Sequence, residues 1–298
     1  MSVEAQRRRK TQHLRHIMEN LGQLEQLHNG LKALAPHFAG GYDEQLVFGG
    51  HLLAQFYLVA KQLRDDAAIH RIDVNFLAMA ATDLPINYEK TQQRGDLLWL
   101  DARQENKLID KSVVKYKAPL SQTTRRNLPE NPPLAEFTDL PSPTSCPVLE
   151  TAPKSEKSSE PFTYEFSHQD RQIFEVRPIE QNGKRIRNYM RLRKELRDSP
   201  INDPMVVPLM ISDYLACLPL SVLNEKLRVQ IESMTSLNHK VVIHTEKCNP
   251  NGWFILELNL EAATTDGLVL GRVAAEDGTP ILNFSQNFQF QLNNQPKL

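Results

Sequence analysis

The sequence is poor in cysteine, and its cysteines form none of the patterns that usually make this residue functional. Cys146, Cys217 and Cys248 are odd in number, contain no CxxC pair and show no zinc-ligand spacing. We therefore predict neither a disulfide framework nor a zinc site, and we expect a reducing compartment. No histidine pair has metal-ligand spacing and no acidic cluster completes a site, so we predict no metal and no cofactor.

A large excess of charge is also missing. The 298 residues include 35 Lys and Arg against 36 Asp and Glu, which gives a formal net charge of −1. Without a global positive field, the sequence predicts no nucleic-acid partner and no attraction to an anionic membrane. Any anion site must be local.

Long apolar runs are absent too. No run approaches the roughly 20 residues that span a bilayer, and the basic start lacks the apolar core of a signal peptide. We expect no membrane span and a bacterial-type cytoplasmic protein. A peroxisomal location is the alternative, because the final Pro296-Lys297-Leu298 is close to a Ser-Lys-Leu address. The missing GxSxG elbow disfavours a serine-nucleophile hydrolase.

The length predicts about two domains, and one segment separates them. Residues 118–161 are dense in Pro, Ser, Thr and charge, so they cannot bury enough apolar area to fold alone. We interpret them as a linker in which FTDL and CPVL are weak surface anchors. The predicted organisation is an N-terminal helical segment at 1–40, a first half at 41–117, the linker at 118–161 and a second half at 162–298.

A buried helix followed by a strand meander occurs in both halves, without residue-level identity between them. Apolar positions at three- and four-residue spacing predict an amphipathic helix from Gln12 to Leu34, packed on the domain rather than in a coiled coil. Mostly apolar helices are expected at 46–63 and 204–223. Elsewhere apolar and polar residues alternate with a period of two, which predicts antiparallel strands. These strands are expected within 69–77, 84–92, 97–104, 112–119, 172–180, 185–196, 241–246, 253–262, 268–276 and 281–291.

Several short motifs occur in a fixed order along the chain. They are VFGGHLLAQ (47–55), FEVRPIE (174–180), SDYLACLP (212–219), SLNH (236–239), NGWFILEL (251–258) and EDGTPILNFSQ (276–286). This ordered set resembles the type II acyl-CoA thioesterases, a double-hotdog family, from about residue 45 onward. The chain departs from the family at His51, where glutamine is usual, and at Asn238, where aspartate is usual. NFLAMAATD also lacks the usual Arg-Pro-Gly corner, and Thr-Glu-Lys replaces the aromatic and arginine pattern after His244.

The resemblance implies an α+β fold of the double-hotdog type. Two long central helices are each wrapped by an antiparallel sheet, and the two sheets are joined into one, which removes two exposed sheet edges. It also implies further assembly into a homo-oligomer, either a dimer or a tetramer.

The same resemblance implies an acyl-CoA thioesterase that hydrolyses fatty acyl-CoA to free fatty acid and CoA by direct water attack. The catalytic positions fall on Asp213, Ser236 and Gln286. Asp213 lies in an apolar helix, where partial desolvation is expected to make it a better general base. Ser236 and Gln286 are expected to orient the attacking water by hydrogen bonds. Taken singly, an aspartate in an apolar helix is as often structural as catalytic, and a lone serine or glutamine is more often structural.

Four further residues are expected to bind the substrate: Gly49, Gly50, His51 and His239. The glycines allow close approach to a helix N-terminus, where backbone N–H groups favour developing negative charge on a thioester carbonyl. Tight helix packing explains the glycine pair equally well. The strand at 184–194 carries four arginines on one side, at 185, 187, 191 and 193; we favour a solvated face over a CoA-phosphate site.

Two other functions remain open at this point. A non-catalytic acyl-thioester binding protein with the same fold is suggested by Asn238 and by the altered corner motifs. A hotdog dehydratase acting on hydroxyacyl thioesters is disfavoured, because such sites normally need a histidine paired with a carboxylate.

Overall fold

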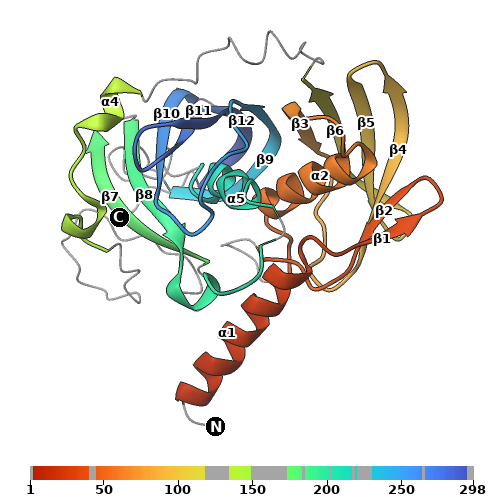
Figure 1. Cartoon of the computed structure of the whole chain (residues 1–298), viewed down its shortest axis with the longest axis horizontal. Helices are drawn as coiled ribbons and strands as arrows, with labels where there is room; N and C mark the ends of the chain where they lie inside the picture. Colours follow the sequence, from red (N-terminus) through yellow and green to blue (C-terminus); the bar gives the residue numbers. More distant parts are fainter. Residues whose placement is uncertain are drawn as a thin grey trace.

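The computed structural model describes residues 3–39, 45–117, 134–148, 173–182, 185–201, 203–216, 219, 230–263 and 266–293 (Figure 1). The N-terminal part contains α1 (Val3–Asn20), β1 (Leu24–Leu27), β2 (Gly30–Ala33), α2 (Gly49–Leu63), β3 (Ile69–Phe76), β4 (Ile86–Arg94), β5 (Leu97–Gln104) and β6 (Lys107–Tyr116). The later part contains α4 (Ala135–Thr138), η1 (Pro143–Ser145), β7 (Phe174–Asn182), β8 (Arg185–Leu192), η3 (Lys194–Leu196), α5 (Val206–Tyr214), β9 (Gln230–Ile243), β10 (Phe254–Ala263), β11 (Asp266–Ala275) and β12 (Pro280–Asn293).

The twelve described strands form one antiparallel sheet. Their order is β1-β2-β4-β5-β6-β3-β9-β12-β11-β10-β8-β7. The two sequence halves meet where β3 pairs with β9, with Arg71 opposite Val242 and Asn75 opposite Asn238. Figure 1 shows the two parts of the sheet on either side of α2 and α5. The site described below lies close to the β3–β9 junction.

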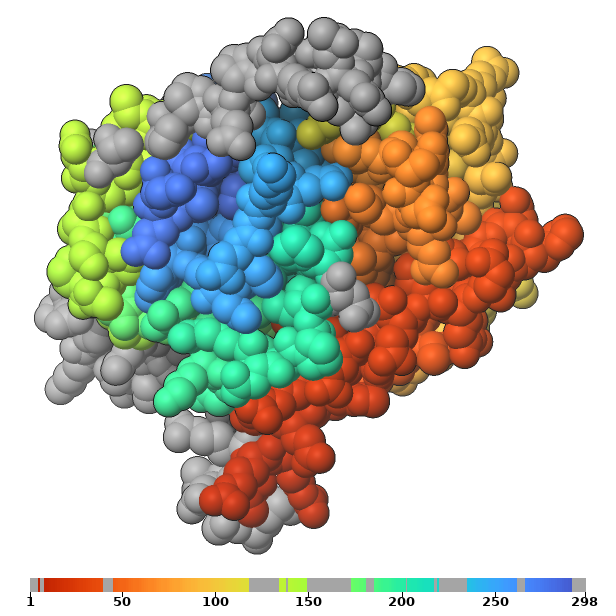
Figure 2. Space-filling view, viewed as in Figure 1, coloured from red at the N-terminus to blue at the C-terminus, as the bar shows by residue number. Residues whose placement is uncertain are grey.

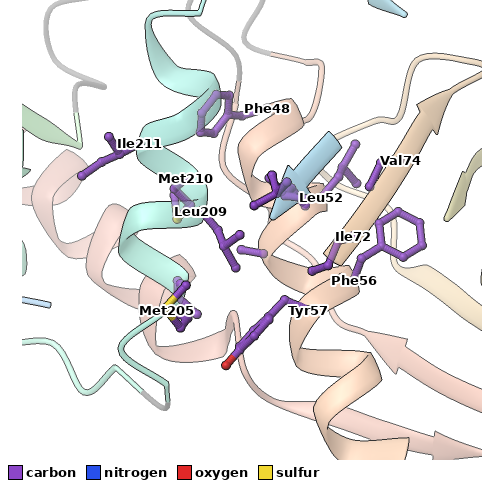
Figure 3. Packing of buried hydrophobic residues seen from close by; sticks show 14 of the residues in the cluster. Phe48, Leu52, Phe56, Tyr57, Ile72, Val74, Met205, Leu209, Met210 and Ile211 are labelled. Carbon is purple, nitrogen blue, oxygen red and sulfur yellow. The ribbon is translucent and has the colours of Figure 1, made fainter. Parts of the chain in front are cut away.

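Helices α2 and α5 pack against each other in the interior. Residues 50–60 of α2 are all buried, and so are 206–212 of α5, because both helices are apolar on most of their circumference. Figure 3 shows α2 side chains between those of α5 and those of β3. The labelled residues are Phe48, Leu52, Phe56, Tyr57, Ile72, Val74, Met205, Leu209, Met210 and Ile211.

The single long helix expected from Gln12 to Leu34 is wrong beyond Asn20. Helix α1 ends at Asn20, and β1 and β2 then form a hairpin in which Leu27 pairs with Gly30. The turn residues are His28 and Asn29, with Gly30 directly after them, and asparagine and glycine are both common in turns. This turn decides the fold here over the helical spacing of the leucines. The N-terminal turns of α1 extend away from the body of the protein (Figures 1 and 2), whereas Ile17 and Met18 near its end are each 2% exposed and pack in the core. No described helix is long and apolar enough to cross a membrane.

The helix expected at 204–223 is described only as far as α5, which ends at Tyr214. Residues 217–218 and 220–229 lie outside the described residues, as do Cys217 and the C-terminal tripeptide. The helix expected at 46–63 begins three residues later, at Gly49, because Leu46 and Val47 make isolated strand bridges instead.

The prediction that β8 presents a solvated face of arginines is wrong. Arg187 is 7% exposed, and all four arginines have carboxylate partners. Because carboxylates neutralise this charge, the strand is also a poor site for phosphates. The pairs are Arg185 and Arg187 with Glu257, Arg191 with Glu175, and Arg193 with Glu195.

Residues 134–148 cover this part of the sheet. Phe137 and Cys146, from the two expected anchor segments, are 2% and 7% exposed and pack in one cluster with Trp253 and Tyr189. The Tyr189 hydroxyl donates to the carbonyl oxygen of Pro141 at 2.9 Å. These anchors are therefore buried contacts rather than loose surface ones.

Candidate active site

The structure brings Asp213, Ser236 and Gln286 together from three separate elements. Asp213 lies in the last turn of α5, Ser236 on β9 and Gln286 on β12. Gln286 Nε2 donates to Asp213 Oδ1 and to Ser236 Oγ, each at 2.7 Å. An amide nitrogen carries two hydrogens, so one side chain makes both bonds. The carboxylate, hydroxyl and amide form one hydrogen-bonded set.

Ser236 reaches this set because the pairing of β9 is irregular at Leu237. Opposite β12, the register moves from Asn238 directly to Ser236, which leaves Leu237 without a partner of its own. An extra residue of this kind reverses the alternation of side chains. Leu237 is 38% exposed, and Ser236 faces the interior together with His239, three residues away. Asn238 lies on the opposite face of the sheet from His239, because it is the next residue along the strand. The replacement of the family's usual aspartate by Asn238 therefore removes no group from the hydrogen-bonded set.

The N-terminus of α2 approaches Asp213 closely. The Gly50 N–H donates to Asp213 Oδ2 at 2.8 Å. A Cβ atom added to Gly49 would lie 2.9 Å from the same oxygen, and one added to Gly50 would lie 2.9 Å from the carbonyl oxygen of Met210. The glycine pair therefore serves both the contact between the helices and the approach to Asp213. The positive end of α2 stabilises a negative carboxylate there.

His239 lies behind Asp213 and is completely buried. Its Nδ1 is 3.5 Å from Asp213 Oδ1, and its Nε2 is 3.1 Å from Ser212 Oγ. The Ser212 hydroxyl donates to the carbonyl oxygen of Leu209 at 2.7 Å, so it accepts from the ring. This direction of the hydrogen bond places the ring hydrogen on Nε2, which leaves Nδ1 without a hydrogen and facing the carboxylate. The Phe284 ring stacks on the imidazole, with centroids 5.2 Å apart.

The expectation that His51 and His239 bind substrate directly is not supported by their positions. His51 is 1% exposed, and its Nε2 lies 3.1 Å from His37 Nδ1 in the interior of the first half. Burial lowers the pKa of His37 to about 4, and it lowers the pKa of His51 well below its usual value. Both first-half rings are therefore neutral at pH 7. His239 is in contact with Asp213 instead.

The set retains unused hydrogen-bonding capacity. The Asp213 side chain is 8% exposed, and Gln286 Oε1 has no partner among the described residues. Ser236 Oγ accepts from Gln286, which leaves its own hydrogen for another acceptor. A carboxylate beside a hydroxyl can hold a water molecule and take a proton from it. No group of three or more His, Cys, Asp or Glu within the described ranges could hold a metal ion.

The sequence matches no protein-family model and no curated protein. Its fold is similar to that of solved structures. The tesB protein of Mycobacterium avium subsp. paratuberculosis is 16% identical, with 93% of this chain and 98% of that chain covered and a TM-score of 0.68. Acyl-CoA thioesterase II TesB2 from Mycobacterium marinum is 16% identical, with 93% and 99% covered and a TM-score of 0.66.

A third similar structure is a conserved protein of unknown function with a hot dog fold from Alicyclobacillus acidocaldarius. It is 14% identical, with 92% of this chain and 97% of that chain covered and a TM-score of 0.62. The structural neighbours are thus TesB-type thioesterases II and hotdog proteins, as the ordered motifs predicted. Identities this low establish the fold, and the activity must be argued from the site.

Proposed function

We propose that the protein is a thioester hydrolase that cleaves acyl-CoA into a free acid and CoA by direct attack of water. The observation that carries the proposal is the hydrogen-bonded set of Asp213, Ser236 and Gln286 at the N-terminus of α2. Two proteins with a similar fold are named as tesB or acyl-CoA thioesterase II, which supports the same reaction class.

In this mechanism Asp213 is the general base. Water held between its carboxylate and the Ser236 hydroxyl loses a proton to Asp213 while its oxygen bonds to the thioester carbon. The C–S bond then breaks, CoA leaves as the thiolate, and the proton on Asp213 passes to the thiolate or to solvent. Gln286 keeps Asp213 and Ser236 at a fixed separation, because both accept from its amide nitrogen.

Negative charge develops on the thioester oxygen during this attack. The first turn of α2 supplies backbone N–H groups and the positive end of a helix dipole. The Gly50 N–H is already bonded to Asp213, so the N–H of Gly49 is the group we assign to the thioester oxygen.

His239 is a positioning residue in this scheme. Its Nδ1 carries no hydrogen and faces Asp213 Oδ1, so once Asp213 has taken the proton from water the acid can donate it to this nitrogen. In His239→Asn we expect kcat to fall by about 10-fold or more with little change in KM, as for an effect confined to the transition state. Steady-state kinetics check this.

The matched control is His70→Asn, because His70 lies on β3 with its ring partly exposed. We expect this variant to retain wild-type kinetics. If His239→Asn keeps the wild-type kcat and KM, His239 has no part in positioning Asp213.

Alanine at the two glycines is expected to separate activity from stability. In Gly49→Ala the new Cβ meets the Asp213 carboxylate, so we expect turnover to fall by about 10-fold or more with a small stability change. In Gly50→Ala the new Cβ meets the Phe48 ring and a backbone oxygen of α5, which is expected to cost about 1–3 kcal/mol. Urea unfolding and turnover of both variants check this. Equal effects of the two variants on activity would contradict it.

A second candidate function is a hotdog dehydratase, and one observation favours it. No histidine–carboxylate pair was expected from the sequence, yet His239 Nδ1 lies 3.5 Å from Asp213 Oδ1. The ring is fully buried behind the carboxylate, which argues against direct contact with a substrate hydroxyl. Product analysis with a 3-hydroxyacyl-CoA distinguishes the two, because hydrolysis releases free thiol and dehydration releases none.

The direct test of the proposed function is thiol release from a panel of acyl-CoAs of different chain lengths. We expect steady release of CoA with at least one chain length. Thermal stabilisation by acyl-CoA without any thiol release would instead identify a non-catalytic acyl-thioester binding protein.

A further inference from the structure

A second group of buried polar side chains lies on the inner face of the first half. Asp110 on β6 is 0% exposed, and neither of its carboxyl oxygens has a hydrogen-bond partner among the described residues. Ser112, two residues along the strand, is 2% exposed, and its hydroxyl lacks a partner within the same ranges. Buried polar atoms in proteins are paired in the large majority of cases. Two neighbouring exceptions on one face therefore need an explanation.

This pair lies one strand away from the candidate active site. Asp110 is the direct neighbour of Phe76 in the pairing of β6 with β3. Phe76 also lies next to Asp213. A Cβ atom added to Gly49 would lie 3.3 Å from the Phe76 ring and 2.9 Å from Asp213 Oδ2. Adjacent strands are about 4.8 Å apart, so Phe76 separates the Asp110 carboxyl from the Asp213 carboxylate.

The strand neighbours of Asp110 on the side away from Phe76 are uncharged. Ala102 of β5 is its direct neighbour there, and Tyr88 of β4 is the partner of Ala102 in the next strand pairing. The Tyr88 hydroxyl donates to Gln55 Oε1 of α2 at 2.6 Å. Burial raises the pKa of Asp110 well above its usual value, and burial with the nearby Asp110 raises the pKa of Tyr88. Burial therefore favours the protonated form of Asp110, and a protonated carboxyl group can both donate and accept hydrogen bonds.

We propose that the acyl chain of the substrate passes Phe76 and ends at Asp110 and Ser112, and that the site takes acyl thioesters with a hydroxyl or keto oxygen along the chain. The inference rests on the proposed function and names its substrate class. The oxygen lies beyond Phe76, remote from the thioester rather than beside it. A plain alkyl chain would leave both polar groups unpaired, and sites built to bind a substrate hydroxyl reject analogues that lack it.

The experiment compares plain acyl-CoA with a series of monohydroxyacyl-CoAs of the same chain length. With the wild-type protein we expect one mid-chain or terminal hydroxyl position to raise kcat/KM by about 100-fold or more over the plain chain. In Asp110→Leu combined with Ser112→Ala, we expect this preference to fall to about threefold or less. Asp110→Asn keeps a donor and an acceptor of similar shape, and we expect it to keep most of the preference.

Thermal unfolding of the same variants separates ligand binding from a structural role. Removing unpaired buried polar groups leaves the Tm of the double variant unchanged or raises it. A clearly lower Tm would show that Asp110 is held by structural water, and this would overturn the inference.

Equal cleavage of plain and hydroxylated chains by the wild type, or a preference that survives in the double variant, would also overturn the inference. If the wild type cleaves no thioester, the proposed function fails. The inference is then decided by whether the hydroxyacyl-CoAs raise the wild-type Tm more than the plain acyl-CoA does, and equal shifts would overturn it.

Discussion

Replacing Asp213 by asparagine is expected to lower kcat by about 10²- to 10⁴-fold, the usual contribution of a general base. Asparagine has the shape of aspartate and keeps one oxygen that can accept from Gln286. It cannot take a proton from water, and its amide nitrogen cannot accept from the Gly50 N–H as Asp213 Oδ2 does. Because the lost interaction belongs to the transition state, kcat and kcat/KM should fall together while KM changes little.

Asp203→Asn is the matched control for this experiment. Asp203 is also partly buried and also accepts from a backbone N–H, that of Met205, but it lies at the opposite end of α5 from Asp213. We expect it to lose some stability and to keep its turnover. A folded Asp213→Asn variant with wild-type turnover would remove Asp213 from the mechanism.

The largest effect on stability is expected at Glu257, which is 0% exposed on β10. Its Oε2 accepts from Arg187 Nε at 2.6 Å and from Arg185 Nε at 2.9 Å, and its Oε1 accepts from Arg272 Nε at 3.0 Å. Glu257→Gln keeps the shape and removes the charge that the three guanidinium groups share. Breaking a buried ion pair from one side costs about 3–5 kcal/mol, so the free energy of unfolding should fall by about that amount.

Urea unfolding of Glu257→Gln and Glu261→Gln measures this difference. Glu261 lies on the same strand and is exposed, so its replacement should change stability by no more than about 0.5 kcal/mol. A loss below about 1 kcal/mol for Glu257→Gln would show that the arginines find other partners. Glu136, which also contacts Arg272 and Arg185, is the first candidate for that replacement.

Much of the sheet could be predicted because its strands are buried on one face. In β3, Ile72 and Val74 face the interior and Arg71 and Asn75 are exposed, and this alternation is visible in the sequence. Helix α2 was predictable for a related reason, since only a buried helix is apolar on most of its circumference.

The hairpin of β1 and β2 was missed because its leucines satisfy two patterns. Leu24, Leu27 and Leu31 have helical spacing, but they also lie on two short strands joined by a turn at His28-Asn29. Local turn chemistry decides between the two patterns, and here it outweighs the helical spacing.

The three members of the candidate site were identified from motif order, not from periodicity. A regular strand would place Ser236 and His239 on opposite faces, and the irregular pairing at Leu237 brings them to the same face. No glycine or proline marks that position. The partners of Glu257 were equally hidden, because Arg185, Arg187 and Arg272 reach it only through the register of β8, β10 and β11.

The most direct test of water attack with Asp213 as base is a single turnover of acyl-CoA in water enriched in oxygen-18. The protein and the released acid are then analysed by mass spectrometry. Direct attack predicts free thiol, one heavy oxygen in the free acid, and a protein that carries neither label nor acyl group. Acylated protein would contradict the account by showing a covalent intermediate, and heavy oxygen in the carboxyl group of Asp213 would show that Asp213 attacks the thioester itself.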